Sequence, residues 1–281
     1  MTDSGEPAGK LDGLPCCDLY TGLVTNEQAV GAARFLLAAR QAGKAGSRLP
    51  EDFRPTSIED ALRVQTLVSE GLGETTRGWK CGAPAADRIN VAPIFRSLVY
   101  VRSPILSPSP IPIKGEVARV EQEIAFVMGR DLPARSMPYT MEEVCAAVSE
   151  VRLVLELIGS RFLPETNAGY LEALADCLSN EGLFVGPAIG LEPADSVLAS
   201  FPIVVQGPDG IVMERDGRHP DGHPTVPLHW LANFLAGRGS GLKTGEIVTT
   251  GSYAGALEMP MNTKLTIMFG GLGDIACELV R

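Results

Sequence analysis

The first part of the chain repeats its apolar residues with the period of an α-helix. Residues 26–42, NEQAVGAARFLLAARQA, place their apolar side chains on one side of an amphipathic helix. A second helix is predicted within residues 55–73, PTSIEDALRVQTLVSEGLG, where Thr56 or Ser57 can cap the N-terminus. Residues 1–20 show no such pattern and are expected to be disordered or loosely attached.

The rest of the chain has short apolar runs separated by glycine turns, a pattern typical of β-strands. The clearest runs are residues 96–102, 118–129 and 151–159, and shorter ones follow up to the C-terminus. Helices are expected at the capping box around Thr140 and at residues 226–237, and the proline-rich stretch SPILSPSPIPIKG is expected at a sheet edge. The pattern predicts an α+β fold, with a small helical N-terminal region followed by a β-rich mixed-sheet domain.

We place the boundary between these two parts at residue 77, so that residues 1–77 form the helical region and residues 78–281 the catalytic domain. With 281 residues, of which 45% are hydrophobic, the chain can bury a large core. Its net charge of −10 disfavours nucleic acid and anionic membrane surfaces as partners. The sequence has no apolar run long enough to span a bilayer and no signal-peptide pattern, so a cytoplasmic protein is expected.

The six cysteines do not form a metal-binding or disulfide pattern. They are spread over the chain without a C-x-x-C pair, and Cys16 and Cys17 are adjacent. Most are expected to be small buried residues. Any metal site must therefore use other ligands.

Three glutamates lie where apolar side chains are expected. Glu121 and Glu123 in RVEQEIAFVMG are two residues apart and would share one face of a strand, while Glu156 lies within the apolar run VRLVLELIG. An unpaired buried carboxylate is strongly destabilising. A divalent cation would stabilise all three, and oxygen ligands favour Mg²⁺ or Mn²⁺. The alternative is that each glutamate pairs with an arginine or a lysine, and Arg119, Arg152 and Arg161 are close enough in sequence to serve.

Several motifs together resemble the fumarylacetoacetate hydrolase superfamily. They are RVEQEIAFVMGRDL followed by LELIGSR, then IEDALRVQ, GWKCG, the long stretch GHPTVPLHWLANFLAGRGSGLKTGEIVTTGS and FGGLG. The closer likeness is to the branch of 2-keto-4-pentenoate hydratases and 4-oxalocrotonate decarboxylases. The resemblance implies a β-rich domain of that fold with one metal per chain, held by Glu121, Glu123 and Glu156. A 2-oxo acid would chelate this metal through its carboxylate and keto oxygens.

The resemblance also assigns a catalytic lysine. Lys80 in GWKCG matches the active-site lysine of the hydratase branch, whereas a lysine without that match would more often be a solvated surface residue. The branch has an aspartate in a PDYG motif that is thought to work with the lysine, and Asn90 falls nearest to it here. Asparagine cannot accept a proton at neutral pH, which makes plain hydratase activity less certain.

Four further residues match substrate-facing positions of the branch. In the motif DSR the aspartate is replaced by Gly159, but Ser160 and Arg161 remain. Thr250 and Ser252 of VTTGSY match a second substrate-facing segment, although such a run is also ordinary turn chemistry.

The positions of the histidines separate the possible reactions. The chain has only His219, His223 and His229, and carbon–carbon hydrolases of this superfamily generally use a histidine much earlier in the chain. His219 and His223 are expected in a loop and His229 in a core or on a helix face.

We therefore expect a metal-dependent lyase that adds water to a 2-hydroxy-2,4-dienoate or 2-oxo-4-enoate in aromatic meta-cleavage catabolism. The alternatives are a 2-oxo acid decarboxylase of the 4-oxalocrotonate type, an acylpyruvate hydrolase, and a catalytically weak relative that binds a 2-oxo acid. The expected partner is a small-molecule 2-oxo acid, and the chain is expected to form a homo-oligomer.

Overall fold

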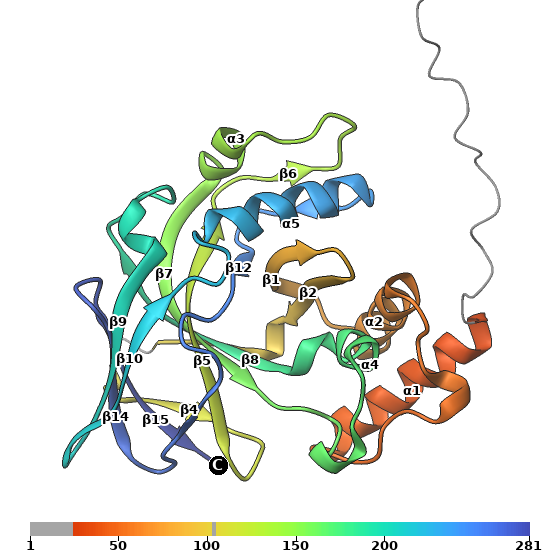
Figure 1. Cartoon of the computed structure of the whole chain (residues 1–281), viewed down its shortest axis with the longest axis horizontal. Helices are drawn as coiled ribbons and strands as arrows, with labels where there is room; N and C mark the ends of the chain where they lie inside the picture. Colours follow the sequence, from red (N-terminus) through yellow and green to blue (C-terminus); the bar gives the residue numbers. More distant parts are fainter. Residues whose placement is uncertain (1–24, 103–104) are drawn as a thin grey trace, which may run out of the picture.

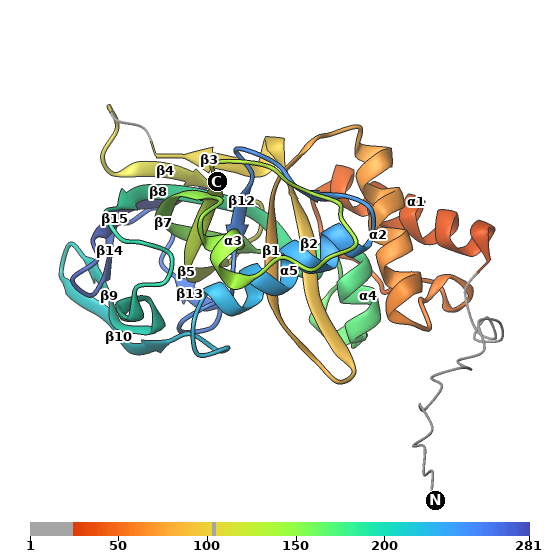
Figure 2. The ribbon, with the colours of Figure 1, turned by 90° about the horizontal axis from the view of Figure 1, so that it is seen from above.

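The computed structural model describes residues 25–102 and 105–281, and it places a group of helices beside two mixed β-sheets (Figures 1 and 2). The predictions for residues 1–20, Cys16 and Cys17 lie outside the described residues. The helices are α1 (Asn26–Ala42), α2 (Ile58–Leu72), α3 (Met141–Cys145), α4 (Tyr170–Ala175) and α5 (Thr225–Gly237). Single 3-10 turns are η1 (Glu51–Phe53), η2 (Arg96–Leu98), η3 (Pro164–Thr166), η4 (Cys177–Ser179) and η5 (Ser196–Ala199).

The two N-terminal helices form where the sequence predicts them. A capping box starts each one, with Thr25 at α1 and Ser57 at α2, and each ends at a glycine in the left-handed conformation. Both helices bury one apolar face, and they pack against each other. The sequence pattern missed α4, which packs on α2 and so brings a later part of the chain to the helical group (Figure 1).

The larger sheet holds the strands that carry the predicted site. Its order is β2-β1-β12-β5-β7-β8-β3, with β13 also paired to β5. The strands are β1 (Thr76–Ala85), β2 (Arg88–Phe95), β3 (Val99–Val101), β5 (Ala118–Met128), β7 (Val148–Ile158), β8 (Asn180–Ile189), β12 (Ile247–Thr249) and β13 (Leu257–Met259). The pairs β1/β12 and β3/β8 are parallel and the other pairs are antiparallel, so the sheet is mixed as predicted.

A second sheet of five strands packs beside the first. Its order is β10-β9-β14-β15-β4. The strands are β4 (Ser109–Pro112), β9 (Ser200–Gly207), β10 (Gly210–Arg218), β14 (Lys264–Phe269) and β15 (Asp274–Val280). The proline-rich stretch forms the edge strand β4, as expected for residues that lack a backbone donor. A short pair, β6 (Leu132–Pro133) with β11 (Gly241–Leu242), lies near α5, which packs against β1.

The α+β class and the order of a small helical region before a β-rich mixed-sheet domain are confirmed. The strand expected at residues 96–102 is shorter, because η2 occupies its first half. The β1–β2 hairpin extends the β-structure back to Thr76. Among the described residues, no helix is both long and apolar enough to cross a membrane.

Candidate metal centre and active site

The central pair of strands brings the three predicted carboxylates together. Strands β5 and β7 run antiparallel, and Glu121 lies directly opposite Glu156. Glu123 is two residues along β5, so it points to the same face of the sheet. One carboxylate oxygen from each of the three glutamates lies within 4.8 Å of the other two. Two separate apolar strands thus build one acidic cluster.

The nearby arginines do not neutralise this cluster. Glu123 and Glu156 are 1% and 0% exposed, and Glu121 is half-buried. The three arginines that could have paired with them bind other carboxylates: Arg119 pairs with Glu258, Arg152 with Glu150 and Arg161 with Asp176. These three arginines are therefore not partners of the cluster. Among the described residues, the pairing alternative holds for Glu156 alone, whose partner is Lys80.

Lys80 is the cation that reaches the cluster. It lies on β1, its side chain is 15% exposed, and its Nζ is 2.7 Å from Glu156 Oε1. The same ammonium group donates to the carbonyl oxygen of Leu178 at 3.3 Å. Lys80 is thus a largely buried member of the acidic cluster, and the surface alternative for it is wrong.

The protein alone leaves the cluster short of positive charge. Three carboxylates face one ammonium group, and a single divalent cation would neutralise the two charges that remain. Glu156 Oε1 accepts from Asn180 Nδ2 at 2.8 Å, but Glu156 Oε2 is buried without a hydrogen-bond partner among the described residues. Glu123 Oε2 accepts from the backbone N–H of Gly251 at 3.0 Å. The all-oxygen donor set and the unpartnered oxygen fit Mg²⁺ or Mn²⁺.

The pKa shifts of the cluster agree with this shortage of positive charge. Burial raises the pKa of Glu121 and, further, the pKa of Glu123, and repulsion from Glu156 adds to both shifts against the opposing effect of Lys80. Burial lowers the pKa of Lys80, but the three glutamates outweigh it and leave that pKa above its ordinary value. In the absence of a metal ion, the raised pKa values of Glu121 and Glu123 therefore favour their protonation, while the raised pKa of Lys80 keeps the lysine charged.

A strained turn helps to position Lys80. Cys177, Leu178 and Ser179 have φ values of 57°, 51° and 59°, so three successive non-glycine residues adopt the left-handed conformation. Such residues are uncommon and each is destabilising by about 1–3 kcal/mol. The turn aims the Leu178 carbonyl at the Lys80 ammonium group.

Arg161 lies behind this turn. Its guanidinium group donates to Asp176 Oδ2 at 2.6 Å and to the carbonyl oxygen of Asn180 at 3.1 Å. Because the Asn180 side chain binds Glu156, Arg161 holds in place a residue that contacts the acidic cluster. Its predicted contact with substrate stays a prediction.

The other predicted site residues lie around the cluster. Asn90 is exposed and pairs with Gly82, two residues along the hairpin from the Lys80–Ala92 pair and on the same face. Ser160 is exposed, and its hydroxyl accepts from the backbone of Phe162.

The segment after β12 meets the cluster through its backbone. The hydroxyls of Thr250 and Ser252 donate to carbonyl oxygens of Ile124 and Gly255. The Gly251 N–H is the group that reaches Glu123. Thr249 lies opposite Lys80 in the sheet, and its buried hydroxyl has no hydrogen-bond partner among the described residues. The hydroxyl-rich pattern VTTGSY pointed to this segment but not to Thr249.

His219 is a supporting residue that the sequence pattern did not identify. Its Nε2 lies 2.9 Å from the Thr250 carbonyl oxygen, and its Nδ1 accepts from the Asp221 N–H at 3.1 Å. Burial lowers the pKa of His219 to about 4, so the ring is neutral and Nε2 donates. His219 therefore helps to fix the backbone at Thr250, next to the Gly251 N–H that binds Glu123. A single histidine in a loop carries no sequence signal for such a role.

The other two histidines bind structural groups. His223 binds Thr225 and the Asp195 carbonyl, and His229 on α5 binds the Tyr139 carbonyl, a helix-face position as predicted. Within the described chain, no histidine is hydrogen-bonded to the glutamates.

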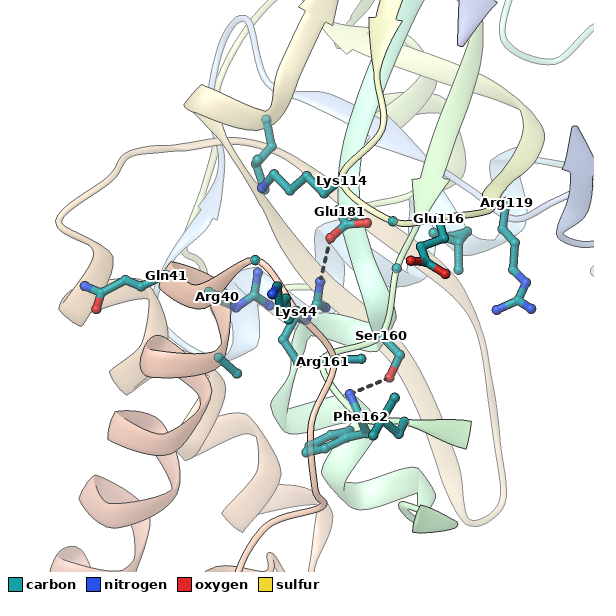
Figure 3. Close-up of a pocket in the computed structure, with 18 of the residues that line it drawn as sticks. Arg40, Gln41, Lys44, Lys114, Glu116, Arg119, Ser160, Arg161, Phe162 and Glu181 are labelled. Carbon is teal, nitrogen blue, oxygen red and sulfur yellow. Dashed lines mark hydrogen bonds and ion pairs between the residues drawn. The ribbon is translucent and has the colours of Figure 1, made fainter. Parts of the chain in front are cut away.

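The described part of the chain contains a cavity of about 560 Å³ (Figure 3). It lies between the end of α1, residues 114–119 and residues 158–164, and its walls include Ser160, Arg161 and Glu181. Arg119 and Ile158 also line it, and they form the cross-strand pair next to Glu121 and Glu156 on the same face. One same-face step along a strand is roughly 7 Å, so the cavity begins close to the carboxylates.

Curated proteins of known activity match almost the whole chain, although no protein-family model does. A 2-keto-4-pentenoate hydratase from Paraburkholderia xenovorans is 26% identical, and the match covers 91% of this chain and 96% of the hydratase. A 4-oxalocrotonate decarboxylase from Pseudomonas sp. strain CF600 is 25% identical over 92% of this chain and 98% of that enzyme. Both belong to the branch that the motifs predict.

Solved structures share the fold. A 4-oxalocrotonate decarboxylase from Pseudomonas putida G7, complexed with magnesium and adipate, aligns with a TM-score of 0.75 at 21% identity, over 92% of this chain and 100% of its own. A fumarylacetoacetate hydrolase family protein from Yersinia pestis aligns with a TM-score of 0.52 at 18% identity, over 73% and 93%. Sequence and fold together thus confirm the resemblance to the 2-keto-4-pentenoate hydratase and 4-oxalocrotonate decarboxylase branch of the fumarylacetoacetate hydrolase superfamily.

Proposed function

We propose that the protein is a Mg²⁺- or Mn²⁺-dependent hydro-lyase that adds water to a 2-hydroxy-2,4-dienoate or 2-oxo-4-enoate in aromatic meta-cleavage catabolism. The observation that carries this proposal is the acidic cluster with its two uncompensated charges and its one lysine. Relatives named as hydratases of such compounds support the choice of substrate.

In this proposal Glu121, Glu123 and Glu156 hold the metal. When bound, the cation supplies Lewis acidity toward the 2-oxo group of the substrate. The Gly251 N–H and the Asn180 amide fix two of the carboxylates, so the ligand geometry exists before the metal arrives.

Lys80 is the proposed proton donor. Its ammonium group is held between Glu156 and the Leu178 carbonyl, and its raised pKa keeps it protonated near neutral pH. A charged donor fixed next to the metal ligands can deliver a proton to a substrate carbon or oxygen at that place. Asn90, on the same hairpin face, is proposed to orient a water or the substrate through its amide, because an amide does not act as an acid or base near neutral pH.

The remaining predicted residues complete the proposed substrate site. Ser160 and Arg161 line the cavity beside the cluster, and Thr250 and Ser252 flank the Gly251 N–H that binds Glu123. Their proposed role is to orient the substrate by hydrogen bonds.

Decarboxylation of a 4-oxalocrotonate-type acid is the second candidate. The 4-oxalocrotonate decarboxylase relative is nearly as similar as the hydratase, and loss of CO₂ also needs an electron sink beside a 2-oxo group. We place hydration first because Lys80 offers a proton donor, which decarboxylation needs less.

The reaction can be identified with three substrates in the presence of Mg²⁺. They are 2-hydroxypenta-2,4-dienoate, 4-oxalocrotonate and an acylpyruvate. Loss of the dienoate absorbance with formation of 4-hydroxy-2-oxopentanoate is the expected result, and CO₂ release from 4-oxalocrotonate alone would favour decarboxylation. Consumption of the acylpyruvate alone would contradict both and identify a hydrolase.

We also propose that the chain acts as a cytoplasmic homo-oligomer with small molecules as its only partners. The acidic composition supports the absence of nucleic-acid partners. Sedimentation of the purified protein at several concentrations tests the oligomer, and a purely monomeric profile would contradict it.

A further inference from the structure

We infer that the cavity beside the acidic cluster selects substrates with an uncharged distal end, and that Glu181 is the residue that sets this selectivity. The inference rests on the proposed function, because the metal would fix the 2-oxo acid end of the ligand. The carbons beyond the 2-oxo group would then extend into the cavity, which begins roughly one same-face strand step from the carboxylates.

A β-bulge aims Glu181 into this cavity. In the pairing of β7 with β8, Leu157 lies opposite Gly182 and Ile158 lies opposite Asn180, so Glu181 is the extra residue without a partner. Bulges turn a side chain away from the regular alternation of a strand. The Glu181 side chain is 20% exposed and lines the cavity near Arg161 (Figure 3).

Gly159 leaves the space that this carboxylate occupies. A Cβ atom at residue 159 would overlap Glu181 Oε2. The glycine and the glutamate therefore depend on each other, since any side chain at position 159 would displace the carboxylate. With glycine in the GSR motif, position 159 has no side chain, and the Glu181 side chain of β8 occupies that space instead.

The inner wall of the cavity is already balanced in charge. Arg161 donates to Asp176 through Nε and Nη2 and to the Asn180 carbonyl through Nη1. Arg40 donates to the same Asp176, and Glu181 lies 4.0 Å from Arg161. Two guanidinium groups thus face two carboxylates, so the inner wall has no excess positive charge for a further anion. Arg40 Nε has no hydrogen-bond partner among the described residues, but it is buried away from solvent.

The cations at the rim do not change this balance. Lys44 and Lys114 line the outer cavity, but both are exposed, and water and salt screen them. A second carboxylate on the substrate would therefore enter the inner cavity next to Glu181 without a partner. A hydrocarbon or hydroxyl group would avoid that repulsion and fit against Phe95, Leu98 and Ile158.

The test compares two unreactive ligands of equal length, 2-oxohexanoate and 2-oxoadipate, by calorimetry on the Mg²⁺-loaded full chain. The wild-type protein is expected to bind 2-oxohexanoate about tenfold more tightly, because one unpaired like charge in a half-buried site weakens binding by at least that factor. In Glu181→Gln, which leaves one guanidinium charge uncompensated, the ratio should shift toward 2-oxoadipate by about tenfold.

Two further variants separate this effect from others. Glu165→Gln removes an exposed charge on the neighbouring turn η3 and should change the ratio by less than about twofold, as expected for a screened charge. Gly159→Ala should displace the Glu181 carboxylate and shift the ratio in the same direction as Glu181→Gln.

Pyruvate, which lacks a distal end, distinguishes the two possible failures. If pyruvate binds in a Mg²⁺-dependent manner but Glu181→Gln leaves the ratio unchanged, the role of Glu181 is wrong and the proposed function stands. If pyruvate does not bind, the proposed function itself fails, and this inference fails with it.

Discussion

Two buried ionic clusters lie side by side in this protein, and they differ in whether the chain completes them. In the first, Arg40 and Arg161 share Asp176, and the three side chains bind one another and backbone carbonyls. In the second, three glutamates share Lys80, and one buried oxygen of Glu156 has no partner among the described residues. The arginine cluster is complete in charge, because two arginines face Asp176 and Glu181, although Arg40 Nε has no hydrogen-bond partner among the described residues. The glutamate cluster is incomplete, because two negative charges remain after Lys80 is counted.

Asn180 connects the two clusters. Its carbonyl oxygen accepts from Arg161, and its side chain donates to Glu156. The arginine cluster thus fixes, through Asn180, the position of Glu156 in the glutamate cluster. Both clusters bury charged groups, so burial of charge alone does not identify a functional site. The glutamate cluster differs in its excess of negative charge, and this excess is what indicates a functional site.

The largest effect is expected when the incomplete cluster loses a ligand. Glu123→Ala should abolish Mg²⁺ binding in calorimetry, because a third of the carboxylate set is lost. The metal-free variant should fold, since the change removes a repulsive charge. Glu258→Ala, which removes an exposed glutamate, is the control, and unchanged metal affinity in Glu123→Ala would refute the site.

Breaking the arginine cluster should mainly lower the stability of the fold, with a smaller effect on metal binding. Asp176→Ala leaves two buried guanidinium groups without their partner and should lower the free energy of unfolding by about 3–5 kcal/mol. Urea denaturation measures this loss. Asp216→Ala removes the partner of an exposed arginine and should cost less than about 1 kcal/mol. Equal effects of the two variants would show that Asp176 is not a structural anchor.

Lys80, the cation that pairs with the glutamate cluster, should matter for turnover and not for metal binding. Lys80→Ala should reduce kcat by about two orders of magnitude, the usual scale for a positioned acid or base. Mg²⁺ affinity should stay the same or rise, because a positive neighbour is removed. Lys264→Ala changes an exposed lysine on β14 and serves as control. Near-normal turnover of Lys80→Ala would remove the lysine from the mechanism.

The smallest effect concerns pH. The pKa values of Glu121 and Glu123 are raised in the folded chain above the ordinary glutamate value of 4.5. As pH rises, the unfolded chain therefore loses these two protons at a lower pH than the folded chain does. Stability without metal should therefore fall as pH rises through the raised pKa values.

Mg²⁺ should reverse this trend, because it competes with the same protons. Melting temperatures with and without Mg²⁺, between about pH 5 and pH 8, should diverge as pH rises. Glu123→Ala should show a smaller divergence than the wild type. A constant difference across this range would contradict the coupling of metal to the glutamates.

The sequence predicted the parts of the site that violate a local pattern. Glu121, Glu123 and Glu156 stand out because carboxylates are rare in apolar strands, whereas Lys80 was identified through the resemblance of GWKCG to a motif of the hydratase branch. The α+β class and both N-terminal helices followed from periodicity and capping residues. The division at residue 77 stays a prediction.

The parts that the sequence could not show depend on contacts between distant segments. Asp176 and Asn180 gain their roles through a left-handed turn, and Glu181 gains its role through a bulge. His219 acts through a carbonyl 31 residues away. Neither a propensity nor a period encodes such contacts, and the short helix α4 was missed because six residues are too few to show a period.

The direct opposition of Glu121 and Glu156 determines where the chain can tolerate insertions and deletions. Side chains alternate between the faces of a strand, so one residue inserted between Glu121 and Glu123 would turn one of them to the opposite face. The segment from 129 to 147, which joins β5 to β7 through β6 and α3, can change in length without moving this pair. Relatives of this protein are therefore expected to differ in length in that connection while the spacing of the two glutamates on β5 stays at two residues.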